Sequence, residues 1–370
     1  MSPPLAAPQE PILSWIRDQE DAIAVLLAAV REDRTAQAYL FHGPRGIGKT
    51  RTALGVAQAL ECTERADAPC GACLACRKVA ALAHPDIRLV FPTTRDEEKD
   101  PEEIARRLEE YGANRYHLLD FARNASIGID RIRELKAEAA KSLAEGRRRV
   151  YILCDAGRML EEAAQSALKL IEEPPQGTHL ILVAEEPAAL LPTIVSRCQQ
   201  VRFRPLRRET VEEILAAVAK LPPGAGRLIA SLASGSLGRA LALAEEGSIV
   251  KSRDAAVALL EPARDAGVVQ ERVREWAGRL DPNAARRTVE LLLAWCHDLV
   301  AVKFGLPESM LSNPDRREDL VRQADALDIA TIRERIDALE EMIDSIDRNV
   351  NPLLALHEAL LRFAGFRREG

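Results

Sequence analysis

One eight-residue stretch constrains this chain more than any other, and its sequence is Gly43-Pro44-Arg45-Gly46-Ile47-Gly48-Lys49-Thr50. The stretch matches G-x-x-x-x-G-K-[ST] at every fixed position, which is the pattern of loops that bind nucleotide phosphates. A short apolar segment at 38–41 precedes it, and an Ala/Leu-rich helical pattern follows at 51–60. Strand, loop and helix in this order predict a phosphate-binding loop. The alternative is a glycine-rich turn without a ligand.

The residue types in this loop suit a phosphate ligand. The glycines let backbone N–H groups converge on phosphate oxygens, and the N-terminus of the following helix adds its dipole. The ammonium group of Lys49 can reach the β- and γ-phosphates, and the Thr50 hydroxyl can ligate magnesium. We therefore expect a nucleotide pocket, with ATP and Mg²⁺ as its candidate ligands.

Composition bounds the class of protein. With 370 residues the chain is long enough for two or three domains. Aromatic residues make up only 4%, while Ala and Leu abound, so helix should dominate. A net charge of −6 argues against bulk electrostatic binding of DNA by this chain alone.

The sequence gives no sign of a membrane protein. Its apolar runs fall short of the roughly 18 residues of a membrane span. The N-terminus has no basic region followed by an apolar core, as a signal peptide would. We therefore expect a cytoplasmic protein with no membrane partner.

Four of the seven cysteines lie close together in the sequence, at Cys62, Cys70, Cys73 and Cys76. The last three have the spacing C-x2-C-x2-C, and Gly71 permits a tight turn between them. In a cytosolic chain such a cluster indicates metal ligands before disulfides. Four thiolates form the closed tetrahedral site that is typical of structural zinc. An iron–sulfur cluster can use similar spacing, although nothing else suggests electron transfer, and unligated or redox-active thiols are a further alternative.

Hydrophobic periodicity divides the rest of the chain. It predicts one amphipathic helix over residues 9–31 and another from 127 to about 144, and the dense charges of 93–116 indicate a solvated insertion. From about 205 the pattern is one of short helices without strand signals, and longer amphipathic helices follow over 251–370.

An apolar strand at 150–154 ends in Asp155. A carboxylate at the C-terminal end of a parallel strand lies where the magnesium of a bound nucleotide is held. ATPases of this class usually follow it with a glutamate that activates water, but the next residue here is Ala156. The nearest substitutes are Glu161 and Glu162. We expect a site that binds ATP and does not hydrolyse it efficiently.

The order of these motifs resembles that of a known family. After the phosphate loop, the cysteines and the acidic strand end come Ser166-Ala167-Leu168-Lys169-Leu170-Ile171-Glu172-Glu173-Pro174-Pro175 and then Ser196-Arg197-Cys198. This order is similar to that of bacterial clamp-loader subunits of the AAA+ class, and it most resembles their delta-prime subunits of DNA polymerase III. The resemblance covers nearly the whole chain. Residues 349–356 more weakly resemble the last helix of the family's collar.

Two departures distinguish members of this family. The motor subunits, gamma and tau, carry Asp-Glu at the strand end, where this chain has Asp155-Ala156. They also carry a sensor arginine in G-S-L-R, whereas this chain has glycine at the fourth position, Gly238, and Arg239 one place later. Resemblance to a delta-prime subunit implies that both the glutamate and the sensor arginine are absent.

The resemblance implies an α/β P-loop domain of AAA+ type with a parallel sheet and the zinc module at 1–203. It also implies a small helical lid at 204–250 and an all-α collar for oligomerisation at 251–370. Its implied partners are the delta and gamma/tau subunits, the sliding clamp and, through the complex, primed DNA. The implied role is to help ATP-dependent clamp loading, with Arg197 donated to ATP in a neighbouring motor subunit. The alternative for Arg197 is a surface or intrachain ion pair.

Two other functions remain open. The first is a motor ATPase of gamma/tau type that uses an unrecognised base, which turnover by the purified chain would favour. The second is a zinc-containing regulator that binds nucleic acid and has a vestigial nucleotide pocket. Tight DNA binding by the isolated chain would favour that function, and the acidic charge and scarce aromatics argue against it.

Overall fold

The computed structural model describes residues 10–64, 69–260 and 282–348, together with the single residues 267, 268, 271, 274, 356, 359, 360 and 363. The chain divides into two compact units. Residues up to 210, with 236–238, form the first unit, and all others belong to the second. The boundaries at 203/204 and 250/251 stay a prediction. Apart from Leu356, the collar motif predicted at 349–356 lies outside the described residues.

The first unit is built on a sheet whose five strands, among the described residues, are all parallel. In sheet order they are β2 (Ile87–Val90), β3 (Arg149–Leu153), β4 (Thr178–Ala184), β1 (Ala38–His42) and β5 (Gln199–Arg202). Leu40 of β1 lies opposite Leu182 of β4, and both are fully buried. Most of β1, β3 and β4 is apolar, at 38–41, 150–153 and 180–184, as is typical of a parallel sheet that helices cover on both faces.

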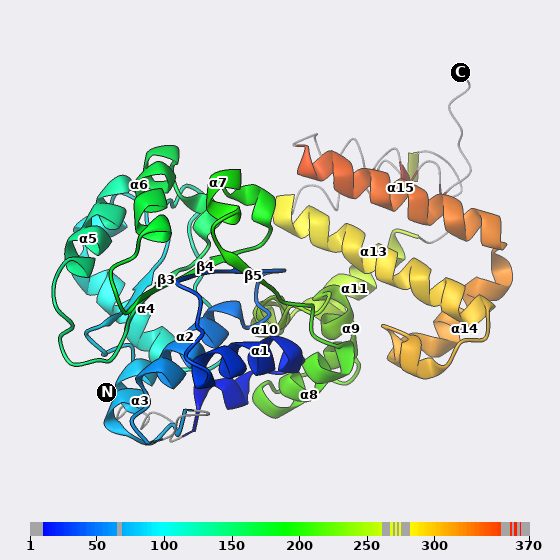
Figure 1. The fold of residues 1–370 in the computed structure, drawn as a ribbon. Coiled ribbons are helices and arrows are strands. Elements are labelled where there is room, and N and C mark those ends of the chain that lie inside the picture. The colour runs from blue at the N-terminus through cyan, green and yellow to red at the C-terminus, as the bar shows by residue number, and fades with distance from the viewer. Residues whose placement is uncertain are drawn as a thin grey trace. The chain divides into compact units, whose positions relative to one another are not determined.

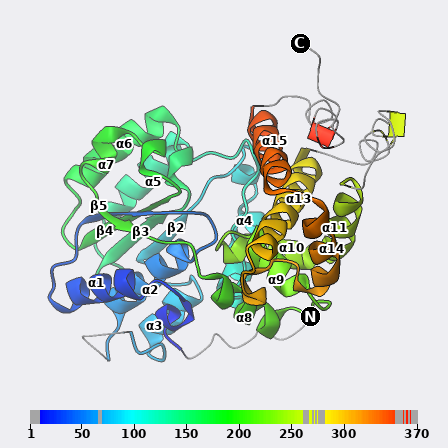
Figure 2. The same cartoon turned by 90° about the vertical axis from the view of Figure 1, so that its right-hand side faces the viewer.

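Helices lie on both faces of this sheet, with α1, α2 and α3 on one side and α5, α6 and α7 on the other (Figures 1 and 2). The helices of this unit are α1 (Glu20–Arg31), α2 (Lys49–Glu61), α3 (Leu74–Ala80), α4 (Pro101–Ala113), α5 (Ile129–Ala139), α6 (Glu161–Glu172) and α7 (Pro192–Val195). Their apolar faces close a core against the sheet, including Leu135 of α5, Ala167 of α6 and Ile194 of α7. The expected α/β architecture with a parallel sheet is confirmed.

The second unit is helical in the part that the structure describes. Its helices are α8 (Arg208–Val218), α9 (Ala225–Leu232), α10 (Leu237–Glu246), α11 (Ile249–Ala258), α13 (Pro282–Lys303), α14 (Arg317–Ala326) and α15 (Ile329–Asp347). The long helix α13 packs against α11, α14 and α15. Its Trp295 is fully buried and donates from Nε1 to Oε1 of Gln323, 2.9 Å away.

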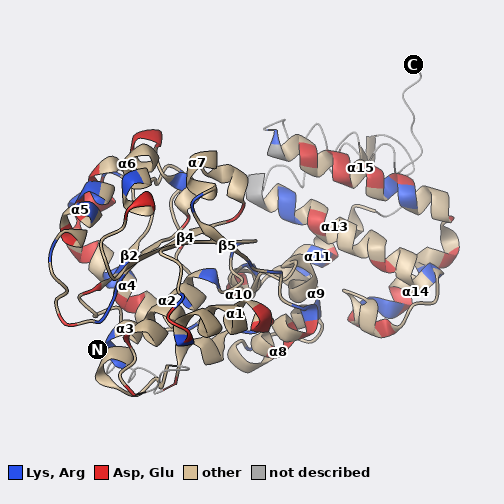
Figure 3. Ribbon diagram, in the orientation of Figure 1, with Lys and Arg blue, Asp and Glu red and all other residues tan. Residues whose placement is uncertain are grey.

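Charged residues of both signs are interspersed along α13 and α15, as Figure 3 shows. Among the described helices, none combines the length and the apolar character that crossing a membrane requires.

The single helix predicted for residues 9–31 is wrong. A short 3₁₀ helix at Ile12–Trp15 is separated from α1 by a turn in which Asp18 has φ 57°. The Asp18 carboxylate accepts hydrogen bonds from the backbone N–H and the guanidinium of Arg207, both at 2.8 Å. This bond to a residue far along the chain holds the turn and breaks the helical pattern.

The helix predicted to reach about Ala144 ends at Ala139. Beyond that residue the guanidinium of buried Arg149 donates hydrogen bonds to the carbonyl oxygens of Lys141 and Ser142, each at 2.9 Å. The Asp86 carboxylate accepts a hydrogen bond from the backbone N–H of Ala144 at 2.9 Å. The side chains of Arg149 in β3 and of Asp86, just before β2, therefore satisfy backbone groups that a longer helix would have paired.

The charged stretch at 93–116 is more ordered than a solvated insertion. It contains α4, whose N-terminus is capped by Asp100 through the N–H of Glu103. Tyr111 is buried at the end of α4, and its ring lies beneath the Arg51 guanidinium, with a distance of 3.6 Å from Cζ to the ring centroid. One face of the segment is solvated and the other packs on α2.

Candidate nucleotide and metal sites

The phosphate loop connects β1 to α2 in a backbone shape that needs its three glycines. Gly43, Gly46 and Gly48 all have positive φ, at 140°, 70° and 98°. A Cβ at Gly43 would lie 2.4 Å from the carbonyl oxygen of Phe203, so the close backbone packing there also excludes a side chain. The helix α2 begins directly after Gly48, at Lys49, and its first N–H groups border the loop.

Lys49 is almost completely buried inside this loop. Its ammonium group donates to the carbonyl oxygens of Gly43 and Pro44. Burial lowers the pKa of Lys49 to about 8, although the carboxylates of Glu185 and Asp155 act in the opposite direction. Lys49 and Asp155, predicted from separate motifs, are therefore close enough to interact electrostatically.

The remaining loop residues are also fixed by contacts. Ile47 is buried, and Arg45 lies 3.5 Å from Glu185 and 3.7 Å from Asp120, measured between nitrogen and oxygen. The Thr50 side chain interacts with the buried thiol of Cys154, whose pKa burial raises to about 12 despite this contact. Asp120 belongs to a segment that sequence reasoning did not connect with the loop, and no motif marks it.

Asp155 stands two residues after β3, as expected for a group at the strand ends, and has a left-handed backbone with φ 49°. Its carboxylate pairs with Nε of Arg158 at 2.9 Å, and Nη1 of Arg158 donates to the Ala122 carbonyl at 2.8 Å. Ala156 is fully buried, and Glu161 and Glu162 are exposed in the first turn of α6. Sequence reasoning had given Arg158 no role, although its spacing from Asp155 would have allowed the ion pair.

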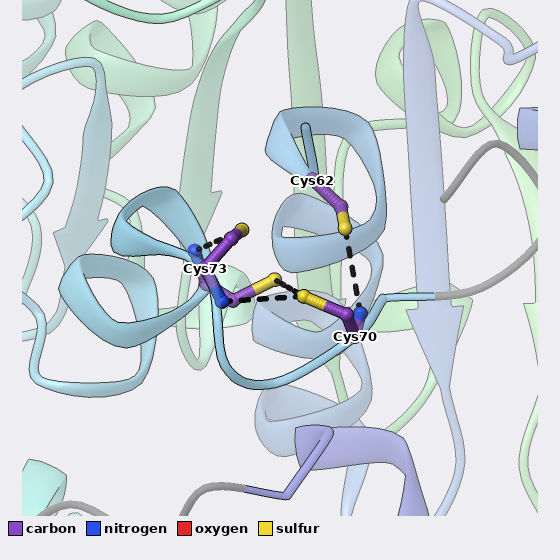
Figure 4. Close-up of side chains that lie close together, drawn as sticks. Cys62, Cys70 and Cys73 are labelled. Carbon is purple, nitrogen blue, oxygen red and sulfur yellow. Dashed lines mark hydrogen bonds between the residues drawn. The ribbon is translucent and has the colours of Figure 1, made fainter. Parts of the chain in front are cut away.

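The four clustered cysteines come together in space, and their sulfur atoms all lie within 4.8 Å of one another. They come from the C-terminus of α2, the following loop and the start of α3, and Figure 4 shows three of them converging. A tetrahedral zinc with Zn–S bonds of about 2.3 Å would place sulfurs about 3.8 Å apart. The donor set therefore fits a closed four-thiolate metal site, and all seven cysteines of the chain are free thiols.

Backbone N–H groups of the cysteines point at the sulfurs. The N–H of Cys70 donates to Sγ of Cys62 at 3.4 Å, and that of Cys73 donates to Sγ of Cys70 at 3.2 Å. Burial raises the pKa of Cys73, but hydrogen bonds from Thr63 and Cys76 outweigh this and lower it to about 6. Such bonds stabilise thiolates, which are the form that binds metal.

The cysteine module is attached to α2 through Gln58, a fully buried amide. Its Oε1 accepts the N–H of Ile12 at 2.9 Å, and its Nε2 donates to the carbonyl of Cys76 at 3.0 Å. Gly71 turns the loop with φ 75°, and a Cβ there would lie 2.5 Å from the backbone of Glu10. The module is therefore packed against the N-terminal segment.

Arg197 lies between two anchored residues. Ile194 and Cys198 are buried in the core beneath α7, whereas the Arg197 side chain is 41% exposed. Its Nε lies 2.5 Å from Oε1 of Glu172, and its Nη1 donates to the carbonyl of Thr193 at 3.0 Å. The intrachain ion pair that the sequence left as an alternative is present in this structure. Sequence reasoning did not identify Glu172 as its partner.

Comparisons with known proteins match two parts of the chain. A family model described as DNA polymerase III, delta subunit, matches residues 18–207, and one described as DNA polymerase III, delta subunit, C terminal, matches residues 271–365. The DNA polymerase III subunit delta' of Bacillus subtilis is 30% identical over 243 residues, covering 66% of this chain and 64% of the relative. That of Pseudomonas aeruginosa is 34% identical over 203 residues, covering 54% and 53%.

The chain is also similar to other DNA polymerase III subunits. The gamma/tau subunit of Mycobacterium tuberculosis H37Rv is 32% identical over 203 residues, covering 55% of this chain and 30% of that protein. Among solved structures, a gamma subunit-related protein of Thermotoga maritima has a TM-score of 0.43 at 15% identity, covering 95% of this chain and all of that one. The matched region spans less than two thirds of the length of each of these curated relatives.

Proposed function

The chain belongs to the delta-prime family of DNA polymerase III clamp-loader subunits, and from this membership we propose that it helps ATP-dependent loading of a sliding clamp onto primed DNA. Its partners in this role are the delta and gamma/tau subunits, the clamp and, through the complex, the primed DNA. In this role the chain is a largely static subunit of the assembly, and other subunits hydrolyse ATP.

The observation that carries this proposal is the fully buried Ala156 directly after Asp155. A hydrolytic site of this class needs a carboxylate there to orient or activate water, and a buried methyl group can do neither. Residues 43–50 and Asp155 still supply the groups that bind a nucleotide and its magnesium. We therefore propose that this chain binds ATP without efficient turnover and that hydrolysis takes place in a neighbouring subunit.

Arg197 is the group that this chain would contribute to that reaction. An arginine that faces the developing charge on a transferred phosphoryl group can accelerate the reaction by about 10³–10⁵. Buried Ile194 and Cys198 hold the backbone on either side of it, while the guanidinium remains at the surface. A rigid base with an exposed cation is the arrangement that an arginine donated to another subunit requires.

The second element of the proposal is a structural Zn²⁺ held by Cys62, Cys70, Cys73 and Cys76. Bound there, the ion supplies folding energy, because it cross-links α2 to α3 through four thiolates. The module has no open ligand position for a substrate, so its role is to stabilise this part of the first unit.

Reconstitution with the cognate clamp-loader subunits tests the function. We expect Arg197→Ala to lower clamp- and DNA-stimulated ATP hydrolysis tenfold or more, which corresponds to about 1.4 kcal/mol of barrier. The chain alone should show no ATP hydrolysis. Size-exclusion chromatography controls for assembly of the complex. Unchanged turnover in an intact complex would show that Arg197 has no catalytic part. Turnover by the chain alone would support the motor ATPase, and tight DNA binding by the isolated chain would support the zinc-containing regulator.

A further inference from the structure

The Arg197 guanidinium is braced on two sides by its own chain. The Glu172 carboxylate lies on the Nε side at 2.5 Å, and the Thr193 carbonyl accepts from Nη1 at 3.0 Å. The side chains of Glu172 and Arg197 are 42% and 41% exposed. This partial exposure leaves the guanidinium accessible to a partner while both contacts restrict how it points.

The local sequence places these groups opposite each other. Glu172 is the last residue of α6, which ends there because Pro174 and Pro175 cannot continue it. Arg197 follows the short helix α7, whose contact with α6 brings the two ends together. The neighbouring Glu173 is exposed, and among the described residues its side chain has no ion pair or hydrogen bond.

These contacts leave one end of the guanidinium for a phosphate. Arginine offers five N–H groups in a planar fork. The Glu172 carboxylate beside Nε, together with the Thr193 carbonyl and, at 3.5 Å, the Ser196 hydroxyl beside Nη1, fixes the plane of the group. The N–H groups of Nη2 can still donate to a phosphate oxygen. A long side chain loses considerable rotamer freedom when it is fixed. An arginine that is already oriented therefore binds a phosphate at lower entropic cost.

We propose that Glu172 is a positioning residue for Arg197, orienting the guanidinium toward the ATP of the neighbouring subunit. This inference rests on the proposed function, because it requires Arg197 to act in trans. Glu172 acts through Arg197 and makes no contact with the nucleotide itself. The negative charge of the Glu172 carboxylate does not prevent Arg197 from stabilising a phosphate, because solvent screens a half-exposed ion pair.

The test compares Glu172→Gln with Glu173→Gln in the reconstituted complex. Both remove one carboxylate from the same turn, but only the first removes the partner of Arg197. We expect Glu172→Gln to lower kcat for ATP about two- to fivefold, the range that a half-exposed ion pair supports. The KM for ATP and the assembly of the complex should not change, and Glu173→Gln should match the unmodified complex.

A double variant shows whether the effect passes through Arg197. Glu172→Gln should cause no further loss when Arg197 is already alanine. An unchanged or increased kcat in Glu172→Gln, or the same loss in the Arg197→Ala background, would overturn the positioning role. If Arg197→Ala is impaired while Glu172→Gln is normal, only this inference fails. If Arg197→Ala retains full turnover, the proposed function fails and this inference fails with it.

Discussion

The backbone N–H of Gly238 donates to the carbonyl oxygen of Gly46 at 3.2 Å, which joins the phosphate loop to residues 236–238. A Cβ at Gly238 would lie 2.7 Å from Cδ1 of Leu118 and 3.1 Å from Cα of Gly46. Gly238 stands at the position where the resemblance to motor subunits implied an arginine, and a side chain there would crowd Leu118 and the phosphate loop. The sequence could not show how closely residue 238 approaches the phosphate loop.

This packing predicts a stability difference between two glycines of similar backbone angle. Gly46 has φ 70° and Gly177 has φ 76°, but only at Gly46 would a Cβ clash, at 2.6 Å from Oγ of Ser236. We expect Gly177→Ala to lower the free energy of unfolding by about 1–2 kcal/mol through backbone strain. Gly46→Ala should cost about 1–3 kcal/mol more because of overpacking. Urea unfolding measures both, and equal losses would show that the contact does not constrain the loop.

The lowered pKa of Lys49 predicts how nucleotide affinity depends on pH. With a pKa of about 8, the free lysine is charged below that pH and increasingly neutral above it. A bound phosphate raises the pKa, so binding takes up a proton where the free amine is neutral. The Kd for ATP should be nearly constant below pH 7.5 and should rise above pH 8, approaching about tenfold per unit.

Titration calorimetry at several pH values provides the measurement, and Lys49→Arg is the control. Arginine stays charged throughout this range, so its pH dependence above 8 should be flat if the variant still binds. An affinity of the unmodified chain that does not change between pH 7 and 9 would contradict the lowered pKa of Lys49.

Local motifs with strict backbone requirements were the part of this molecule that could be predicted. The phosphate loop, the strand before it and the convergence of Cys62 with Cys70 follow from glycines and spacings that allow few alternatives. The break in the helix near Asp18 could not be predicted in this way. It depends on Arg207, a residue 189 positions away, and periodicity carries no information on such a contact.

The partners of charged residues could not be predicted from the sequence either. The resemblance implied a role for Arg197 in a neighbouring subunit, but its pairing with Glu172 depends on how α6 and α7 end. Arg149 appears in the sequence as one of three successive arginines, but the fold buries it and uses it to end α5. Which arginine of such a run turns inward is decided by the register of β3.

Metal removal should expose the role of the cysteine module. We expect the purified chain to carry one zinc, which Cys73→Ser and Cys76→Ser lose, whereas Cys296→Ser retains it because that buried thiol lies outside the cluster. A strong chelator should lower the Tm of the unmodified chain by at least about 5 °C and should not lower that of Cys73→Ser further. Elemental analysis and thermal unfolding check this. Zinc retained after both substitutions would exclude the four-thiolate site.

The last prediction concerns Asp86, whose buried carboxylate holds the loop before β3. It accepts the N–H groups of Ala144, Glu145 and Gly146 at 2.8–2.9 Å. Burial raises the pKa of Asp86, but these bonds and the Arg149 guanidinium outweigh it, so the pKa is lowered from 3.8. Because the folded pKa lies below the unfolded one, the carboxylate contributes stability above about pH 3.8 that is lost as the pH falls through the folded pKa.

Asp86→Asn replaces one acceptor oxygen with an amide that faces N–H groups. We expect it to lower the free energy of unfolding by about 2–4 kcal/mol at pH 7, since hydrogen bonds to a charged group contribute about 1.5–3 kcal/mol each. The difference from the unmodified chain should shrink as the pH falls below 4. Asp96→Asn is the matched control, because the Asp96 side chain is 98% exposed and should change stability by less than about 0.5 kcal/mol. A loss for Asp86→Asn that stays the same at pH 7 and pH 3 would mean that packing, and not the charge, holds this loop.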